Sequence, residues 1–387
     1  MTNRAFSVYV HVPFCRVRCG YCDFNTYTGQ QLRGFSQSEY AEVACAEISL
    51  ARATLAGTGD EPRRVDTVFF GGGTPTQLPV DDLITMLRRI DDEWGLAPGC
   101  EITTEANPDT VDAPALDRLA HAGFTRVSFG MQSAVPHVLA TLDRTHTPQR
   151  VPQVVEWAKA AGLQTSLDLI YGTPGESMAD WRSSVEAALA CEPDHLSAYA
   201  LIVEQGTKLA RQIRHGEVAE PDDDLTADKY EWLDQRMRAA DFDWYELSNW
   251  ARVADDGLER RCRHNLHYWQ GDDWWGVGPG AHSHVGDQRW HNLKHPAPYA
   301  EQVRAGRLPE AARETLDATS VYEERVMLAS RLRTGLPVQD IAPERRGLLE
   351  QMIDDGLIDD ASVRSGALVL TLRGRLLADR VVADLLV

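Results

Sequence analysis

Three cysteines, Cys15, Cys19 and Cys22, lie within eight residues of one another in the stretch CRVRCGYCDF. These spacings are too tight for a disulfide framework, so the pattern indicates metal ligands. If His11 joined the three thiolates, they would form a closed tetrahedral zinc site. If they held a [4Fe-4S] cluster, one of the four irons would lack a protein ligand and could bind a substrate or cofactor. The chain has no second CxxC pair, as paired zinc knuckles would, and this favours the cluster.

A second set of residues suited to binding chemistry is spread along the first half of the chain. It consists of the glycine-rich turn GGGTPT at 71–76 and of Glu105, Gln132, Arg144 and Asp168. Glycines let the backbone approach a ligand closely, although such a turn also serves simply to connect a strand to a helix. Carboxylates accept hydrogen bonds from hydroxyl groups, and arginine can clamp a carboxylate with two parallel hydrogen bonds.

These residues need a common scaffold, and the sequence provides repeated βα units. Short β-rich runs alternate with helical patterns, and the runs cover residues 6–12, 65–72, 101–106, 126–131, 164–172 and 195–203. Such a repeat predicts a parallel sheet with helices outside it. The glycine turn, Glu105, Gln132 and Asp168 all fall at or just past the C-terminal ends of strands. Because one ligand can reach so many strand ends only on a curved sheet, we predict a partial (β/α)6 barrel over residues 1–205.

Composition excludes several classes of function. The 387 residues carry a formal net charge of -19, which argues against nucleic acid as a partner because lysine and arginine dominate phosphate binding. No apolar run approaches 18 residues and no signal peptide precedes the first strand, so we expect no transmembrane segment and a cytoplasmic location.

The other cysteines are scattered singly. Cys45, Cys100 and Cys191 have apolar neighbours, as small buried hydrophobic residues do.

The stretch YVHVPFCRVRCGYCDF resembles the cluster loop of radical S-adenosylmethionine proteins, in the subgroup that contains oxygen-independent coproporphyrinogen III dehydrogenase and the HemW haem chaperones. The resemblance implies that Cys15, Cys19 and Cys22 hold a [4Fe-4S] cluster. In this family the open iron binds the amino and carboxylate groups of S-adenosylmethionine. An electron from the cluster then cleaves the sulfonium and gives a 5′-deoxyadenosyl radical.

The same resemblance assigns further cofactor-binding residues. Gly72, Gly73 and Thr74 belong to the turn that the family uses for the methionine amino end. The positions that match those holding S-adenosylmethionine are Glu105, Gln132, Arg144 and Asp168. Tyr9 and Tyr21 flank the cysteine loop and would position the cofactor. For Tyr9, packing inside the barrel is the alternative interpretation.

Two departures separate this chain from the dehydrogenase. The dehydrogenase has a further cysteine, in a CxxxCxxCxC pattern, at the position where this chain has Phe24. The dehydrogenase also has an extension ahead of its barrel, whereas this chain reaches its first strand at about Phe6. Both differences indicate the HemW-like branch.

The segment CRHNLHYWQGDDWWGVGPGAHS contains the HNxxYW pattern that is associated with haem in HemW-like proteins. The pattern consists of His264, Asn265, Tyr268 and Trp269. Imidazole is a common axial ligand of haem iron, and aromatic rings offer flat apolar surface to a macrocycle. The alternative is that this segment covers the open end of the sheet. We interpret the remaining histidines of the region as loop or core residues: His282, His284, His291 and His295.

The rest of the chain predicts two further units. Residues 206–298 would extend the barrel and carry the haem segment. Residues 299–387 resemble a winged-helix-like α+β domain, with helices near 320–335 and 343–356, a hairpin near 367–372 and a last amphipathic helix. From Glu301 onward the chain has 12 Arg, no Lys and 15 Asp plus Glu, so a basic DNA-binding face is excluded. We interpret this unit as a packing or partner domain.

The resemblance therefore predicts a HemW-like haem chaperone that binds a [4Fe-4S] cluster, S-adenosylmethionine and haem. It implies haem-acceptor proteins as partners, membrane respiratory haemoproteins among them, and a ferritin-like protein as a haem donor. The alternative function is enzymatic, namely the oxidative decarboxylation of coproporphyrinogen III, against which Phe24 argues. A DNA-binding regulator is disfavoured by the negative charge.

Overall fold

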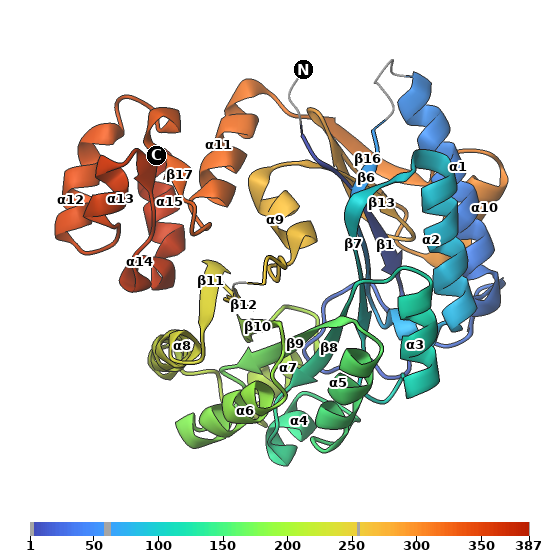
Figure 1. The fold of residues 1–387 in the computed structure, drawn as a ribbon, viewed down its shortest axis with the longest axis horizontal. Helices are drawn as coiled ribbons and strands as arrows, with labels where there is room; N and C mark the ends of the chain where they lie inside the picture. The colour runs from blue at the N-terminus through green and yellow to red at the C-terminus, as the bar shows by residue number, and fades with distance from the viewer. Residues whose placement is uncertain (1–3, 58–62, 254–255, 387) are drawn as a thin grey trace.

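The fold is built on one long curved sheet, seen in Figure 1. The structure is a computed structural model, and it describes residues 4–57, 63–253 and 256–386. Within these ranges twelve strands join in the order β11-β12-β10-β9-β8-β7-β6-β1-β13-β14-β15-β16. The middle of the sheet is parallel and both of its edges are antiparallel.

The six predicted strands are confirmed, and all of them lie in the parallel part of the sheet. They are β1 (Phe6–Val12), β6 (Val65–Gly72), β7 (Leu96–Ala106), β8 (Arg126–Gln132), β9 (Gln164–Tyr171) and β10 (His195–Ala200). Their runs of apolar residues are buried from both sides, as in β1, where all residues except Tyr9 are buried. The predicted α/β class and partial barrel are confirmed.

Helices cover the outer face of the parallel strands. They are α1 (Tyr40–Gly57), α2 (Val80–Trp94), α3 (Ala113–His121), α4 (Pro136–Thr141), α5 (Arg150–Ala160) and α6 (Met178–Ala190). In α2 the buried residues Leu83, Met86, Leu87 and Ile90 repeat at intervals of three and four, which places them on the face toward the sheet.

Segments beyond residue 205 extend the sheet at both edges. At one edge β13 (Asp273–Val277) pairs parallel to β1 and continues into β14 (His282–Val285), β15 (Gln288–Asn292) and β16 (Glu310–Thr315). Two helices, α7 (Lys208–Arg214) and α8 (Asp223–Arg238), lead to the other edge. There the aromatic stretch FDWYELSNWA forms a hairpin of β11 (Phe242–Glu246) and β12 (Asn249–Arg252). The helix α9 (Arg263–Gln270) lies between these two additions in the sequence.

The C-terminal part forms a smaller helical unit, drawn orange to red in Figure 1. It contains α11 (Ala318–Ala329), α12 (Leu349–Asp354), α13 (Asp360–Arg364), α14 (Leu372–Leu376) and α15 (Ala378–Leu386). Up to Leu386, where the described residues end, its strands are the short antiparallel pair β17 (Leu336–Pro337) and β18 (Ala367–Leu368). These strands take the place of the predicted hairpin, and the predicted last helix divides at Leu377.

The sheet continues beyond residue 298, where the sequence predicted a boundary between units. The helix α10 (Pro296–Arg304) spans this position, and β16 pairs with β15. The apolar core of the C-terminal unit is built from later residues, beginning with Val326. Residues 299–315 therefore lie with the sheet. In the described ranges no helix is long and apolar enough to cross a membrane.

Candidate functional site

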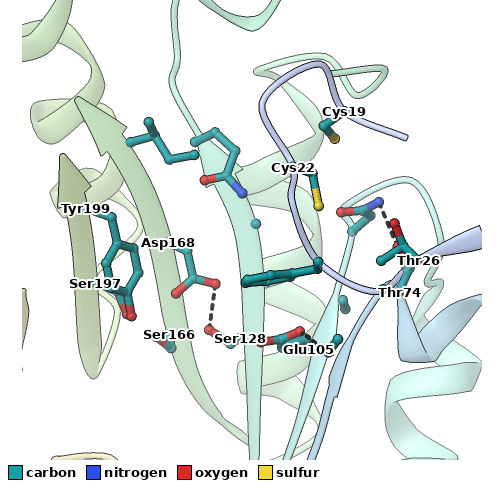
Figure 2. Close-up of a pocket in the computed structure, with 18 of the residues that line it drawn as sticks. Cys19, Cys22, Thr26, Thr74, Glu105, Ser128, Ser166, Asp168, Ser197 and Tyr199 are labelled. Carbon is teal, nitrogen blue, oxygen red and sulfur yellow. Dashed lines mark hydrogen bonds between the residues drawn. The ribbon is translucent and has the colours of Figure 1, made fainter. Parts of the chain in front are cut away.

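A cavity of about 690 Å³ opens inside the barrel and reaches the C-terminal ends of the strands. Fifteen of the sixteen site residues predicted from the sequence line it: Tyr9, Cys15, Cys19, Tyr21, Cys22, Gly72, Gly73, Thr74, Glu105, Gln132, Arg144, Asp168, His264, Asn265 and Tyr268. Figure 2 shows part of this cavity, with Cys19 and Cys22 on a loop above the ends of the strands. The volume lies within the range of cavities that bury a small cofactor.

The cysteine loop runs from the end of β1 toward α1. Its ends are held by the short parallel pair of β2 (Phe14–Cys15) and β3 (Tyr27–Thr28), and β4 (Gln31–Leu32) pairs with β5 (Phe35–Ser36) before the helix. The side-chain amide of Asn25 donates to the carbonyls of Pro279 and Lys294, which ties the loop to the far edge of the sheet. The three cysteines are free and half-buried.

His11, the fourth ligand of the zinc alternative, is engaged elsewhere. Its Nδ1 lies 3.0 Å from the Tyr9 hydroxyl, and its Nε2 lies 3.0 Å from the Asn25 carbonyl oxygen. Burial lowers the pKa of this imidazole. Since both nitrogens have partners inside the protein, His11 supports the loop and offers no nitrogen to a metal.

Two of the sulfur atoms receive hydrogen bonds from the cavity wall. The Thr74 hydroxyl donates to Cys15 Sγ at 3.8 Å, and the Arg144 guanidinium donates to Cys19 Sγ at 3.7 Å. Burial raises the pKa of Cys15 to about 11, so this thiol keeps its proton at neutral pH unless a metal displaces it. Among the described residues, no group of three or more His, Cys, Asp or Glu is already arranged to hold a metal ion. Three free thiols, two of which accept hydrogen bonds, nevertheless fit the ligand chemistry of an iron–sulfur cluster.

The glycine-rich turn brings β6 against the cysteine loop. Gly72 has a φ of +107°, and a Cβ added there would lie 2.5 Å from the His11 ring. A Cβ on Gly73 would lie 2.7 Å from the carbonyl oxygen of Phe14. The backbone amides of Gly73 and Thr74 donate to the carbonyls of Val12 and Phe14. The turn thus needs glycine because the loop backbone packs directly on it.

Two buried carboxyl groups lie below the cysteine loop, and Figure 2 shows them on neighbouring parts of the cavity wall. Glu105 accepts from the backbone amide of Gly72 at 3.2 Å, and Asp168 accepts from the Ser128 hydroxyl at 2.9 Å. Burial raises the pKa of Asp168 to about 6. Burial, followed by the charge of Asp168, raises the pKa of Glu105 to about 8. Both groups therefore have free hydrogen-bonding capacity toward a polar ligand.

Arg144 and Gln132 complete this wall of the cavity. The Arg144 guanidinium donates to Asn107 Oδ1 and to the Gly130 carbonyl, both at 2.7 Å, in addition to Cys19. Gln132 adopts a φ of +59°, in the left-handed region that residues other than glycine rarely occupy. Such strain is retained where the surrounding structure holds it, commonly at a ligand site.

His264 lies at the opposite end of the cavity, on α9. Only 2% of its surface is exposed, and its ring stacks on Phe69 with 5.2 Å between the ring centres. Its Nδ1 lies 2.7 Å from the Thr67 hydroxyl, and its Nε2 lies 2.9 Å from the Tyr268 hydroxyl. Burial lowers the pKa of this imidazole to about 3, so the ring is neutral. The helix α9 therefore closes this end of the barrel with an internally satisfied histidine.

Comparison with known proteins agrees with the arrangement of the cavity. Residues 9–188 match the Radical SAM superfamily. The chain is 50% identical over 387 residues to "Heme chaperone HemW" of Mycobacterium tuberculosis (strain ATCC 25618 / H37Rv), covering 100% of this chain and 96% of the relative. It is also 31% identical to "Heme chaperone HemW" of Bacillus subtilis (strain 168), covering 97% of each chain. The chain belongs to the HemW family of radical SAM proteins.

A solved structure supports the fold of this HemW family member. Coproporphyrinogen III oxidase (HemN) from Escherichia coli, a radical SAM enzyme, aligns with a TM-score of 0.83 at 24% identity. The alignment covers 99% of this chain and 90% of that one. At this level of identity the match shows a common fold.

Trp269 is the one predicted site residue that does not line the cavity. It packs, half-buried, in a small apolar cluster with Tyr245, Ala251, Leu266 and Leu332. Successive residues on a helix point about 100° apart, so with Tyr268 on the cavity side, Trp269 points in another direction, toward this cluster. Within the HNxxYW pattern the tryptophan thus fixes α9 to its neighbours in this structure.

The cavity also contains residues that the sequence analysis missed, and the alternation of side chains along a strand would have identified some of them. On four strands in succession alternate residues line the wall: Thr103, Glu105 and Asn107; Ser128, Gly130 and Gln132; Ser166, Asp168 and Ile170; Ser197, Tyr199 and Leu201. In a strand, residues i, i+2 and i+4 face the same side. Extending the pattern by two positions from Glu105, Gln132 and Asp168 identifies their neighbours, whereas β10 carried no predicted residue from which to extend.

Proposed function

We propose that this protein is a haem chaperone of the HemW type, which binds a [4Fe-4S] cluster, S-adenosylmethionine and haem and passes haem to acceptor proteins. One observation carries the proposal: the cysteine loop, the polar residues at the strand ends and the HNxxYW helix all face a single cavity. The relatives that match this chain over its full length are named as haem chaperones.

In this proposal Cys15, Cys19 and Cys22 hold the cluster. When bound there, the cluster would supply reducing electrons for chemistry on S-adenosylmethionine. Thr74 and Arg144 donate hydrogen bonds to two of the sulfurs, which stabilises negative charge on the thiolates.

Around the cluster, the chain's own residues orient S-adenosylmethionine. Glu105 and Asp168 accept hydrogen bonds from its polar groups, and Arg144 pairs with its carboxylate. The amide of Gln132 contributes both a donor and an acceptor. The apolar and aromatic lining, which includes Tyr9, Tyr21 and Phe69, restricts the access of water to this part of the cavity.

The proposed cofactor site is tested by single substitutions. We expect Asp168→Ala and Arg144→Ala each to weaken S-adenosylmethionine binding about tenfold to a hundredfold, because each removes a charge-assisted hydrogen bond of roughly 1.5–3 kcal/mol. Asp117→Ala, in an exposed side chain on α3, is the control and should bind as the wild type does. Isothermal titration of anaerobically reconstituted protein measures the three affinities, and wild-type affinity in both cavity variants would remove the proposed pocket.

A second test separates the chaperone from a porphyrinogen oxidase. We expect purified protein to take up haem at one site per chain, followed by its absorption spectrum. Under anaerobic, reducing conditions with S-adenosylmethionine, we expect no conversion of coproporphyrinogen III, measured by the fluorescence of the oxidised porphyrin product. Turnover of coproporphyrinogen III without haem uptake would establish the enzymatic alternative instead.

The partners follow from this proposal. Acceptors are haem-requiring proteins, membrane respiratory haemoproteins among them, and a ferritin-like protein serves as a haem donor. We assign the C-terminal unit to packing or partner contacts. Its exposed surface includes Val321 and Met327.

A further inference from the structure

Exposed apolar side chains lie at the mouth of the cavity. Val17, Phe24, Tyr199 and Ile202 line the cavity and are 43%, 58%, 47% and 68% exposed. They account for four of the nine large apolar side chains that are exposed in the described ranges. Val17 and Phe24 come from the cysteine loop, whereas Tyr199 and Ile202 come from the end of β10 and the residues after it. Apolar surface gathered in this way on a soluble protein commonly marks a binding site.

The rim differs in chemistry from the cavity below it. The deeper wall offers carboxyl, amide and guanidinium groups, namely Glu105, Asp168, Gln132 and Arg144. At the mouth these give way to Phe24 and Ile202, with Ala200 and Leu201 beside them. A polar cofactor matches the deeper wall and leaves the rim to a second, apolar ligand.

One cation accompanies the apolar rim. Arg18 is exposed and lines the mouth, and its guanidinium donates to the Cys22 carbonyl at 3.5 Å. It forms no ion pair with a carboxylate among the residues that the structure describes. A guanidinium in this position can bind a carboxylate of the ligand through two parallel hydrogen bonds. Although the carboxylates of Asp23 and Glu204 also line the cavity, Arg18 offers one cation to the acidic edge of an otherwise apolar ligand.

Haem has this combination of a flat apolar macrocycle and propionate groups. The closed end of the barrel is less accessible to it, because the His264 ring is 2% exposed and both its nitrogens are hydrogen-bonded. To bind His264, the haem iron would have to displace the Thr67 or the Tyr268 hydroxyl from a ring nitrogen. The rim requires no such rearrangement.

Resting on the function proposed above, we infer that haem binds at the mouth of the cavity, with its macrocycle against Phe24, Val17, Tyr199 and Ile202 and a propionate on Arg18. The ring then lies beside the cysteine loop with one edge in solvent. An acceptor protein can contact this exposed edge directly, so haem can leave without the barrel opening. In this arrangement Phe24 contributes ring contact at the position where the dehydrogenase has a cysteine.

The test is a titration of the full-length protein with ferric haem. Phe24→Ser and Ile202→Ser should each raise the haem Kd about tenfold, which corresponds to about 1.4 kcal/mol. Leu258→Ser is the matched control, since Leu258 is 61% exposed and does not line the cavity. It should bind haem as the wild type does. Circular dichroism verifies that the three variants are folded, as expected for substitutions of exposed side chains.

Arg18→Gln tests the acidic edge of the ligand. It should raise the Kd for haem about fivefold and leave the Kd for the dimethyl ester of haem unchanged, because the ester has no carboxylate to pair. Wild-type haem affinity in the Phe24 and Ile202 variants, with loss of binding only in His264→Ala, would overturn the rim site while leaving the chaperone proposal in place. Absence of haem binding by the wild-type chain would overturn both.

Discussion

Replacing Cys15, Cys19 or Cys22 with alanine is expected to abolish the iron–sulfur cluster. The wild-type protein, reconstituted without oxygen, should hold about four irons and four sulfides per chain. With three protein ligands, no cysteine is dispensable, because the loss of one leaves two irons without a protein ligand. Iron and sulfide analysis and the charge-transfer absorption of the cluster measure the result.

The other cysteines provide matched controls for this experiment. Cys45 and Cys100 are buried, and their thiols donate only to the carbonyls of Thr85 and Glu101. Cys191 donates to the carbonyl of Ala187 in its own helix. Alanine at any of the three should leave the iron content unchanged, and loss of the cluster there would contradict the assignment.

The parallel half of the fold could be predicted because its signals are local. The strands β1, β6 and β9 are short apolar runs, each followed by an amphipathic helix, and this alternation is visible in the sequence alone. The strand-end rule then placed Glu105, Gln132 and Asp168 at one edge of the sheet, and they line one cavity as predicted.

The two antiparallel edges could not be predicted in the same way. The run DWWGV becomes β13 because it pairs with β1, more than 250 residues earlier in the chain. No local pattern identifies that partner, since strand pairing depends on tertiary contacts. The same holds for β16, which extends the sheet beyond the boundary that the sequence pattern indicated at residue 298.

The hydrogen-bond partners of His264 could not be predicted from the sequence either. The HNxxYW pattern shows that an imidazole and a phenol lie one helical turn apart, and the structure shows them bonded to each other, with Thr67 on the other ring nitrogen. Whether a histidine is free for a ligand depends on such partners from distant strands. Its role as a haem ligand therefore stays a prediction, and the exposed rim that the structure brings together could not be seen in the sequence.

A buried carboxyl group supports the cysteine loop from behind. Glu47 on α1 is 1% exposed and accepts hydrogen bonds from the Gly278 amide at 2.8 Å, the Asn292 side-chain amide at 2.6 Å and the Tyr299 hydroxyl at 2.5 Å. These bonds hold the turn whose Pro279 carbonyl receives the Asn25 amide. Since Asn25 follows Cys22 by three residues, Glu47 fixes the surface on which the loop rests.

Removing this carboxyl group should strongly destabilise the fold. Glu47→Ala leaves the Gly278 amide and the Tyr299 hydroxyl without this acceptor, and Asn292 keeps only the Gly278 carbonyl. Each unsatisfied group costs about 1–3 kcal/mol, so we expect the free energy of unfolding to fall by roughly 3 kcal/mol or more. Glu42→Ala, an exposed acid on the same helix, is the control and should change it by less than about 0.5 kcal/mol. Urea denaturation of the cluster-free protein measures both values, and equal stability of the two variants would refute the proposed support.

The raised pKa of Glu47 predicts that the stability of the fold depends on pH. Burial raises the pKa of Glu47 to about 7, against the opposing effect of its three donors, whereas in the unfolded chain the carboxyl has its ordinary pKa near 4.5. The folded state therefore binds the proton more tightly, so this contribution to stability is fully present below about pH 4.5 and is lost as the pH rises through about 7. The difference amounts to roughly 3 kcal/mol, at 1.36 kcal/mol for each unit of pKa.

Glu105 and Asp168 act in the same direction, so the measurement compares the wild type with Glu47→Gln, whose amide does not titrate. The stability of the wild type relative to this variant should decline between about pH 4.5 and 7, and parallel curves would show that Glu47 keeps an ordinary pKa.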